Sequence, residues 1–208
     1  RHPINGYPMP LFPIKLRFRG NQIVKCKKLQ PANVSNAGQE GRLSIITDDL
    51  LRRIKQNYTL DWYGTHGVYH WFRVWQNGIR LSRQAGVNQP VVELFSIFHD
   101  SQRLTEDTDH GHGSRGADLA LQFRKYIDLS DDGFELLLEA CRLHTTAKSH
   151  HTITVQVCFD SDRLDIGRAG IKPVPELLCS PLPKNRNIIE WAYTKSLADP
   201  LLSKPFLV

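Results

Sequence analysis

Residues 90–100 read PVVELFSIFHD, an almost continuously apolar segment that ends in a histidine and an aspartate. Pro90 suits the first turn of a helix, where its missing N–H is not needed. A helix that is apolar on all sides is buried inside a protein, so the segment predicts a buried helix that ends at His99 and Asp100. A buried carboxylate is costly unless it is paired or coordinates a metal. Taken alone, however, such a dipeptide is more commonly an Asp that opens a loop beside a solvent-facing His.

Helical periodicity recurs on both sides of this segment. From Tyr63 to Gln84, apolar residues return at near-helical spacing, which is typical of an amphipathic helix. The polar residues 101–111 indicate a loop. Because the periodic segments are all helical, the sequence predicts an all-α fold. The further helices expected are Asp48–Tyr58, His112–Tyr126, one that Ser130 caps and that runs to Cys141, Thr154–Arg168 and Ile188–Leu197.

The two ends of the chain differ from this periodic middle. Residues 1–40 contain five prolines and little periodicity, and we expect an irregular N-terminal extension there, with short strands only at Leu16–Arg19 and Ile23–Val24. Residues 41–180 form the predicted helical domain. Residues 181–208 are expected to form a Pro-rich C-terminal segment with one short helix.

The composition is that of a globular protein. Of 208 residues, 40% are hydrophobic and 23% are charged, which argues against wholesale disorder. The formal net charge of +6 indicates either a solubilising surface or attraction to phosphate or nucleic acid. The dense basic stretch Lys15–Lys28 matches no nucleic-acid motif, so nucleic acid is a less favoured partner than a small phosphorylated molecule.

The cysteines argue against a zinc–thiolate protein, and the apolar runs argue against a membrane protein. The four cysteines show no CxxC spacing, which disfavours a zinc–thiolate site, and Cys141 and Cys158 lie in apolar contexts typical of core residues. No apolar run approaches the roughly 20 residues of a membrane span, and no signal peptide is recognisable. We therefore expect a cytoplasmic protein with no membrane partner.

The histidines are clustered along the chain. Nine are present, and all but His2 fall between positions 66 and 151, a clustering for which metal binding is one reason. His66 and His70 are four residues apart in a predicted helix and would share a face. Gly67 stands where the zinc-protease motif HExxH has its glutamate, so that class is excluded. Of these two histidines we expect one ligand, His70.

An aspartate stands on the apolar stripe of a later predicted helix. Asp162 needs a partner there, which is either a metal ion or a basic residue such as Arg163 or Arg168. Asp160 and Asp165 lie close enough in sequence to compete for the same role. Together with the three ligand candidates above, Asp162 completes a set of nitrogen and oxygen donors. Such a set suits Mn, Fe, Co, Ni, Mg or Zn rather than a soft-metal thiolate site.

Three segments, in this order, resemble the HD-domain superfamily of metal-dependent phosphohydrolases. They are HWFRV at 70–74, FSIFHD at 95–100 and SDRLD at 161–165. The resemblance covers about residues 66–180 and implies an HD-domain helical bundle with a divalent metal ion. It assigns the ligands to His70, His99, Asp100 and Asp162, with Asp160 as the alternative to the last.

Two further segments extend the resemblance. Residues 109–117 look like the HxxxGA helix start of many HD proteins, with His112 as its histidine, and His144 stands where some members have another. In two-metal members such histidines bind the second ion. The resemblance thus implies that His112 and His144 contact a second metal or the substrate phosphate. The alternative is that His112 is a polar loop residue near a helix start.

Arg103 and Glu106 follow the HD pair by three and six residues. If the helix continues for another turn, Arg103 points toward the same site, where its guanidinium can hold a phosphate. Glu106 can orient the attacking water as a general base, and Asp100 can assist proton transfer. Lys148 and Arg163 are further candidates for phosphate binding. The alternative is a surface ion pair between Arg103 and Glu106, worth less than about 1 kcal/mol.

The resemblance implies a metal-dependent hydrolase of a phosphate ester or phosphoanhydride, in which metal-activated water attacks phosphorus. A nucleotide or another small phosphorylated molecule is the expected substrate. Two alternatives stay open: a non-catalytic HD-fold module that binds a metal or nucleotide for regulation, and an HD-type di-iron oxygenase. The number of metal ions, one or two, also stays open.

Overall fold

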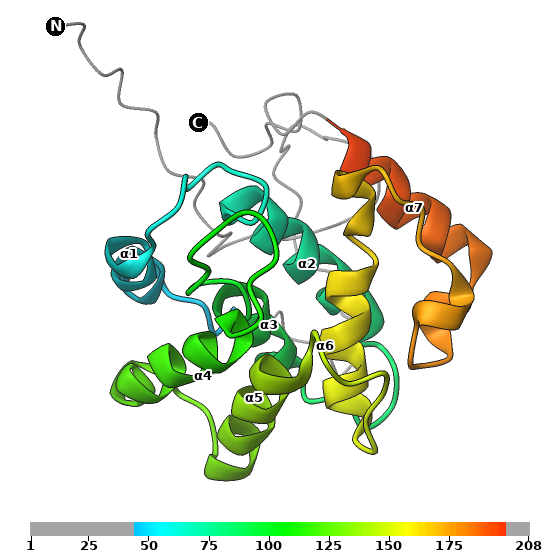
Figure 1. Cartoon of the computed structure of the whole chain (residues 1–208). Coiled ribbons are helices and arrows are strands. Elements are labelled where there is room, and N and C mark those ends of the chain that lie inside the picture. Colours follow the sequence, from blue (N-terminus) through cyan, green and yellow to red (C-terminus); the bar gives the residue numbers. More distant parts are fainter. Residues whose placement is uncertain (1–43, 199–208) are drawn as a thin grey trace, which may run out of the picture.

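Residues 44–198 are described by the computed structural model, and they form helices and turns without a strand (Figure 1). This confirms the predicted all-α class. The expectations for residues 1–40 and for Lys15–Lys28 lie outside the described residues. The α-helices are α1 (Asp48–Asn57), α2 (Val68–Leu81), α3 (Gln89–Phe98), α4 (His112–Gln122), α5 (Asp131–Leu143), α6 (Ile153–Arg163) and α7 (Arg186–Leu197). The short 3-10 helices are η1 (Arg124–Tyr126), η2 (Ile166–Ala169), η3 (Pro175–Leu177) and η4 (Leu182–Lys184).

Helix α3 lies at the centre of the fold, with α2, α4, α5 and α6 packed around it (Figure 1). Every residue from Pro90 to Phe98 is buried, and Pro90 occupies the first turn, as the sequence predicts. Each buried Leu, Ile or Phe side chain contributes about 1.5–3 kcal/mol relative to exposure. Helix α3 therefore fixes His99, its C-cap residue, and the adjacent Asp100 deep inside the bundle.

The second predicted helix starts later than expected. Helix α2 begins at Val68 because the residues before it fold back in tight turns. The N–H of Val68 donates to the carbonyl of Trp62 at 2.8 Å, and a Cβ at Gly67 would collide with that same carbonyl. The expectation that His66 shares a helix face with His70 is therefore wrong, since His66 lies in the turn that precedes α2.

Two other predicted helices are divided. The segment His112–Tyr126 forms α4 and η1, and Thr154–Arg168 forms α6 and η2. At the end of α6 the backbone tightens, and the N–H of Asp165 donates to the carbonyl of Asp162 at 2.8 Å. Asp165 is buried as a result, rather than continuing the surface of a longer helix.

The predicted start of α5 and the predicted last helix are both present. Ser130 caps α5 by accepting a hydrogen bond from the N–H of Gly133 at 3.3 Å. The helix expected at Ile188–Leu197 is α7, which begins slightly earlier, at Arg186. Helix α7 packs against η2, η4 and α2, and so covers the segment that follows α6. The division of the chain at residue 180 stays a prediction.

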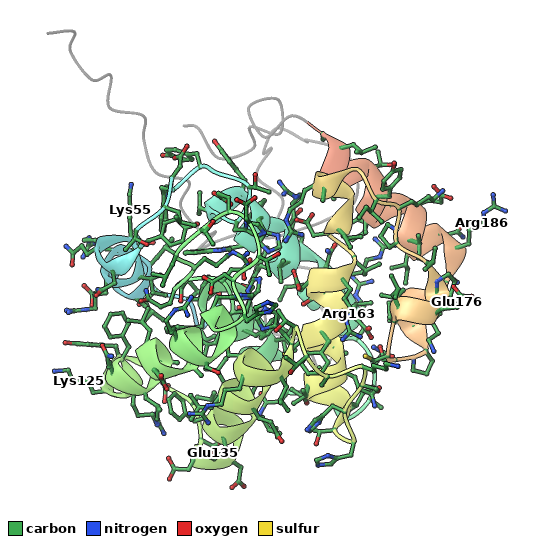
Figure 2. The ribbon with its side chains drawn as sticks, in the orientation of Figure 1. Lys55, Lys125, Glu135, Arg163, Glu176 and Arg186 are labelled. Carbon is green, nitrogen blue, oxygen red and sulfur yellow. The ribbon has the colours of Figure 1, made fainter. Side chains whose placement is uncertain are left out.

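Core and surface residues are separated as expected for a folded domain. Cys141 and Cys158 are buried and free, as predicted. Exposed charged side chains such as Lys125, Glu135 and Arg186 project from the periphery (Figure 2). Within residues 44–198, none of the helices combines the length and the apolar character that crossing a membrane requires.

Candidate metal centre

Three helices bring together His70 of α2, His99 at the end of α3, and Asp162 of α6, which we call the first set. The Nε2 atoms of His70 and His99 are 3.0 Å apart. Oδ1 of Asp162 lies 3.4 Å from the first of these nitrogens and 3.8 Å from the second. Oδ2 of Asp100 approaches the same two nitrogens at 3.4 and 3.7 Å. The four predicted ligands therefore point toward one another.

Asp100, His112 and His144 form a second set. His112 is the first residue of α4, and His144 is the C-cap residue of α5. Their Nε2 atoms are 2.9 Å apart. Oδ1 of Asp100 lies 3.1 Å from Nε2 of His112 and 3.9 Å from Nε2 of His144. Asp100 thus turns one carboxylate oxygen toward each set.

The histidines of both sets share one hydrogen-bonding arrangement, in which Nδ1 faces an oxygen that acts as an acceptor. The pairs are His70 with Asp165 Oδ2 at 2.7 Å, His99 with the Phe95 carbonyl at 3.1 Å, His112 with the Asp109 carbonyl at 2.5 Å, and His144 with the Cys141 carbonyl at 2.8 Å. Each Nδ1 can therefore donate its proton to that oxygen, and in a neutral ring of this tautomer the lone pair lies on Nε2. Two such lone pairs face each other in each set, an arrangement that a cation stabilises.

The pKa values of His99, His144 and Asp100 match this arrangement, whereas that of His112 favours the protonated ring. Burial lowers the pKa of His99 to about 3 and also lowers the pKa of His144. Burial lowers the pKa of His112 too, but its contact with Asp100 outweighs this and raises the pKa above its ordinary value. For Asp100 burial acts upward, yet the neighbouring imidazoles hold its pKa well below the usual range. An ionised carboxylate among imidazoles is the form that binds a divalent metal, so the residues fit such an ion.

Asp165 supports the first set from outside it. Its carboxylate accepts from Nδ1 of His70 and from Nε and Nη2 of Arg73, at 2.7, 2.7 and 3.1 Å. A carboxylate behind a metal-binding histidine orients the ring and raises its basicity. From the sequence, Asp165 stands out only as a neighbour of Asp162. The available signal was its pairing with Arg73, since each follows a ligand candidate by three residues.

Asp160 has a different role from Asp162. Its carboxylate accepts from the backbone N–H groups of Cys179 and Ser180 at 2.6 and 2.8 Å, and from the Ser180 hydroxyl at 2.6 Å. It belongs to neither set. Asp160 therefore anchors the segment before η4, and Asp162 is the aspartate of α6 that lies with His70 and His99.

Arg103 and Glu106 lie near the centre without pairing with each other among the described contacts. Nη1 of Arg103 is 3.5 Å from Oδ1 of Asp100, and its other donors bind the carbonyls of Thr105 and Asp107. Arg103 thus holds the loop 101–111 beside the second set. The Glu106 carboxylate accepts from the backbone N–H of His66 at 3.2 Å and lies 2.5 Å from its Nδ1.

The remaining candidates lie outside both sets. Arg163 donates to backbone carbonyls of neighbouring segments, those of Ala147, Lys148 and Leu177. Its guanidinium therefore joins loops, and the Lys148 side chain is exposed. Three further histidines of the clustered region, His110, His150 and His151, are members of neither set.

Comparison with known proteins agrees with this architecture. No protein-family model matches the sequence, and no curated protein matches it. The fold matches the crystal structure of a predicted HD superfamily hydrolase from an uncultured Thermotogales bacterium, with a TM-score of 0.54 and 21% sequence identity. The match covers 70% of this chain and 84% of that chain. The chain has the HD fold.

The HD fold explains why residues so far apart in sequence meet. Both sets surround the C-terminal end of α3, because α2 and α6 pack on one part of this helix and α4 and α5 on another. His99 and Asp100 therefore stand where the two groups of helices converge. The predicted HD-domain helical bundle is confirmed as the fold.

Proposed function

We propose that this protein is a metal-dependent hydrolase that cleaves a phosphate ester or a phosphoanhydride. The observation that carries the proposal is the pair of facing Nε2 atoms in each set, with the Asp100 carboxylate directed at both. Burying imidazole lone pairs and a carboxylate that face one another costs free energy unless a cation lies between them. The matching HD-fold structure is described as a predicted hydrolase, which supports the same class of activity.

The proposed ligands divide between two ions. His70, His99, Asp100 and Asp162 would hold one ion, while Asp100, His112 and His144 would contribute to a second. Nitrogen and oxygen donors without thiolates suit Mn, Fe, Co, Ni, Mg or Zn. A divalent ion supplies positive charge to the transferring phosphoryl group and lowers the pKa of water to about 7.

The chain's own side chains would orient the reacting groups and exchange protons with them. Asp100 lies between the two sets, where it can accept a proton from the attacking water. Arg103 neutralises part of the Asp100 charge and keeps the loop 101–111 closed over the second set. Glu106 is the proposed general base of the loop, and its hydrogen bonds with His66 fix its carboxylate.

The proposed substrate is a nucleotide or another small phosphorylated molecule. The formal net charge of +6 favours an anionic ligand. Asp162, whose side chain is 21% exposed, is the most accessible ligand candidate, whereas the His70 and His99 side chains are fully buried. A phosphate group can therefore approach the first set from the side of Asp162.

The test combines metal analysis with a substrate screen. Elemental analysis of the full chain, purified without added metal, should find a divalent metal. The chain reloaded with Mn, Co, Ni, Mg or Zn should then release phosphate or a nucleoside monophosphate from a panel of phosphomonoesters, dinucleotides and nucleoside triphosphates. Bound metal without turnover in any combination would favour the regulatory module.

The shared Asp100 carboxylate also fits a second candidate, the di-iron oxygenase. His70, His99 and Asp162 with Asp100 would hold one iron, and Asp100 with His112 and His144 would contribute to a second. The two irons would supply the oxygen-activating chemistry of such an enzyme. Iron-loaded protein that consumes oxygen, and that shows optical bands of bridged iron, would support this activity in place of hydrolysis.

A further inference from the structure

Arg168 has hydrogen-bond donors without a partner at the edge of the candidate metal centre. It lies on η2, the short helix that follows α6, and its side chain is 16% exposed. Nη1 donates to the backbone carbonyl of Asp165 at 3.1 Å and lies 3.7 Å from its Oδ2. The buried Nε atom has no hydrogen-bond partner among the described residues. A buried donor left in this state costs about 1–3 kcal/mol.

The other arginines near the centre are committed to partners. Arg73 donates through Nε and Nη2 to the Asp165 carboxylate. Arg103 binds loop carbonyls and faces Asp100, and Arg163 binds three carbonyls. Arg168 therefore differs from these three in having a guanidinium edge available to a ligand.

The position of Arg168 matches the accessible side of the first set. It touches Asp165, whose carboxylate holds His70. Successive turns also connect it to Asp162: the N–H of Arg168 donates to the carbonyl of Asp165 at 3.1 Å, and the N–H of Asp165 donates to the carbonyl of Asp162 at 2.8 Å. Since Asp162 is the most accessible member of the first set, Arg168 stands beside the side from which a substrate approaches.

Helix α7 holds η2, and with it Arg168, in place. Gly167 packs so closely on Tyr193 and Ser196 that a Cβ added to it would collide with the Ser196 hydroxyl. The backbone that carries the Arg168 side chain is therefore anchored on α7. A guanidinium held on an anchored backbone loses less freedom on binding a ligand.

We propose that Arg168 binds the phosphate group of the substrate through its free guanidinium edge. The planar fork of donors matches phosphate geometry and stays charged at any physiological pH. This inference rests on the proposed phosphohydrolase function and names the residue that recognises its substrate.

The test uses the metal-loaded full chain and inorganic phosphate as the probe. Arg168→Gln removes the charge and the fork, Arg168→Lys keeps the charge, and Arg83→Gln, at an exposed position in the turn that follows α2, is the matched control. Isothermal titration should show phosphate affinity reduced about 10- to 100-fold in Arg168→Gln, less in Arg168→Lys, and unchanged in Arg83→Gln. Metal content and melting temperature should stay those of the unaltered protein. With a hydrolysed substrate, KM should rise more than kcat falls.

Two results would overturn the inference while leaving the proposed function intact. One is turnover by the unaltered protein together with unchanged phosphate binding and KM in Arg168→Gln. The other is loss of metal from Arg168→Gln, which would show that Arg168 acts through Asp165 as a structural support. If the unaltered metal-loaded protein neither binds phosphate nor hydrolyses any ester, the proposed function fails, and this inference fails with it.

Discussion

The first and second sets share Asp100, but only the first has a histidine supported by a carboxylate, since His99 donates to the Phe95 carbonyl. His70 in the first set donates to the carboxylate of Asp165, whereas His112 and His144 in the second set both donate to backbone carbonyls. A negatively charged acceptor makes the imidazole a stronger ligand than a neutral carbonyl does. The first set is therefore expected to bind its metal ion more tightly.

Accessibility also differs between the two sets. The Asp162 side chain is 21% exposed, whereas the side chains of His112 and His144 are 5% and 2% exposed. The first set is accordingly the one that we propose a phosphate group reaches, whereas the second set lies at the ends of α4 and α5 beside the loop 101–111. The variants below test this asymmetry.

The largest effect is expected at the residue that both sets share. Asp100→Ala should remove metal from both sets and abolish phosphohydrolase activity, because each set loses a carboxylate oxygen at once. Elemental analysis and the substrate screen measure the two outcomes. The control is Asp128→Ala, at an exposed position outside the centre, which should keep both properties. A full metal content in Asp100→Ala would show that Asp100 is not a ligand.

Removing one histidine from each set tests metal binding by the two sets separately. His70→Ala should lose the tightly held ion and, with it, activity. His144→Ala should retain metal in the first set, because the donors of His70, His99 and Asp162 are unchanged. Metal-to-protein ratios after dialysis measure the difference. Equal metal loss in the two variants would contradict the predicted asymmetry.

A smaller effect is expected from the supporting carboxylate. Asp165→Asn leaves every candidate ligand in place but removes the charge behind His70, so metal affinity should fall about 10- to 100-fold. The matched control is Asp160→Asn, a second buried aspartate near the end of α6 whose partners are Cys179 and Ser180. This control should lower stability and leave metal affinity unchanged. Competition with a chelator measures the affinity, and the same loss in both variants would remove Asp165 from its supporting role.

The smallest effect concerns the loop that covers the second set. Burial raises the pKa of Asp109, but the ion pair with Arg115 and the N–H groups of Leu104 and Gly111 lower it to about 2. A carboxyl with a lowered pKa stabilises the fold above its unfolded pKa, and this contribution is lost as the pH falls toward 2. Asp109→Asn should therefore cost about 1 kcal/mol at pH 7, allowing for the partial exposure of Arg115.

The difference between Asp109→Asn and the unaltered protein should shrink between pH 4 and pH 2, without metal in either sample. Urea unfolding at several pH values measures it. A difference that stays constant over this range would show that the charge of Asp109 does not contribute. If Asp109→Asn is reloaded with metal at pH 7 and lacks metal only in the second set, the loop is linked to that set.

Local sequence patterns predict much of the architecture. The apolar segment at 90–100 predicts both the buried helix α3 and the inward position of His99 and Asp100, because a helix without a polar face has no side to turn to solvent. Helix ends were less predictable. Gly67 and the turn onto Trp62 delay the start of α2, and this depends on a close backbone approach that periodicity does not encode.

Some features of the candidate site are likewise predictable from local sequence, and others are not. The types of the candidate ligands and their order along the chain follow from the sequence, since His70, the pair His99 and Asp100, and Asp162 stand on three separate helical segments with a recognisable pattern. The assignment of Asp160 to a loop, of Asp165 to His70 and of Glu106 to His66 required the folded chain. The partners of these three carboxylates are distant in sequence or lie in other segments, so local pattern does not identify them.

The amino-acid sequence thus specifies a buried helix, the amphipathic helices around it and a supply of imidazole and carboxylate donors, because these properties depend on neighbours within a few turns. Packing of α2, α4, α5 and α6 around α3 selects which donors converge, which oxygen of Asp100 faces which set, and which guanidinium is left with a free edge. Those outcomes depend on distances between segments dozens of residues apart, and such distances exist only once the helices have packed.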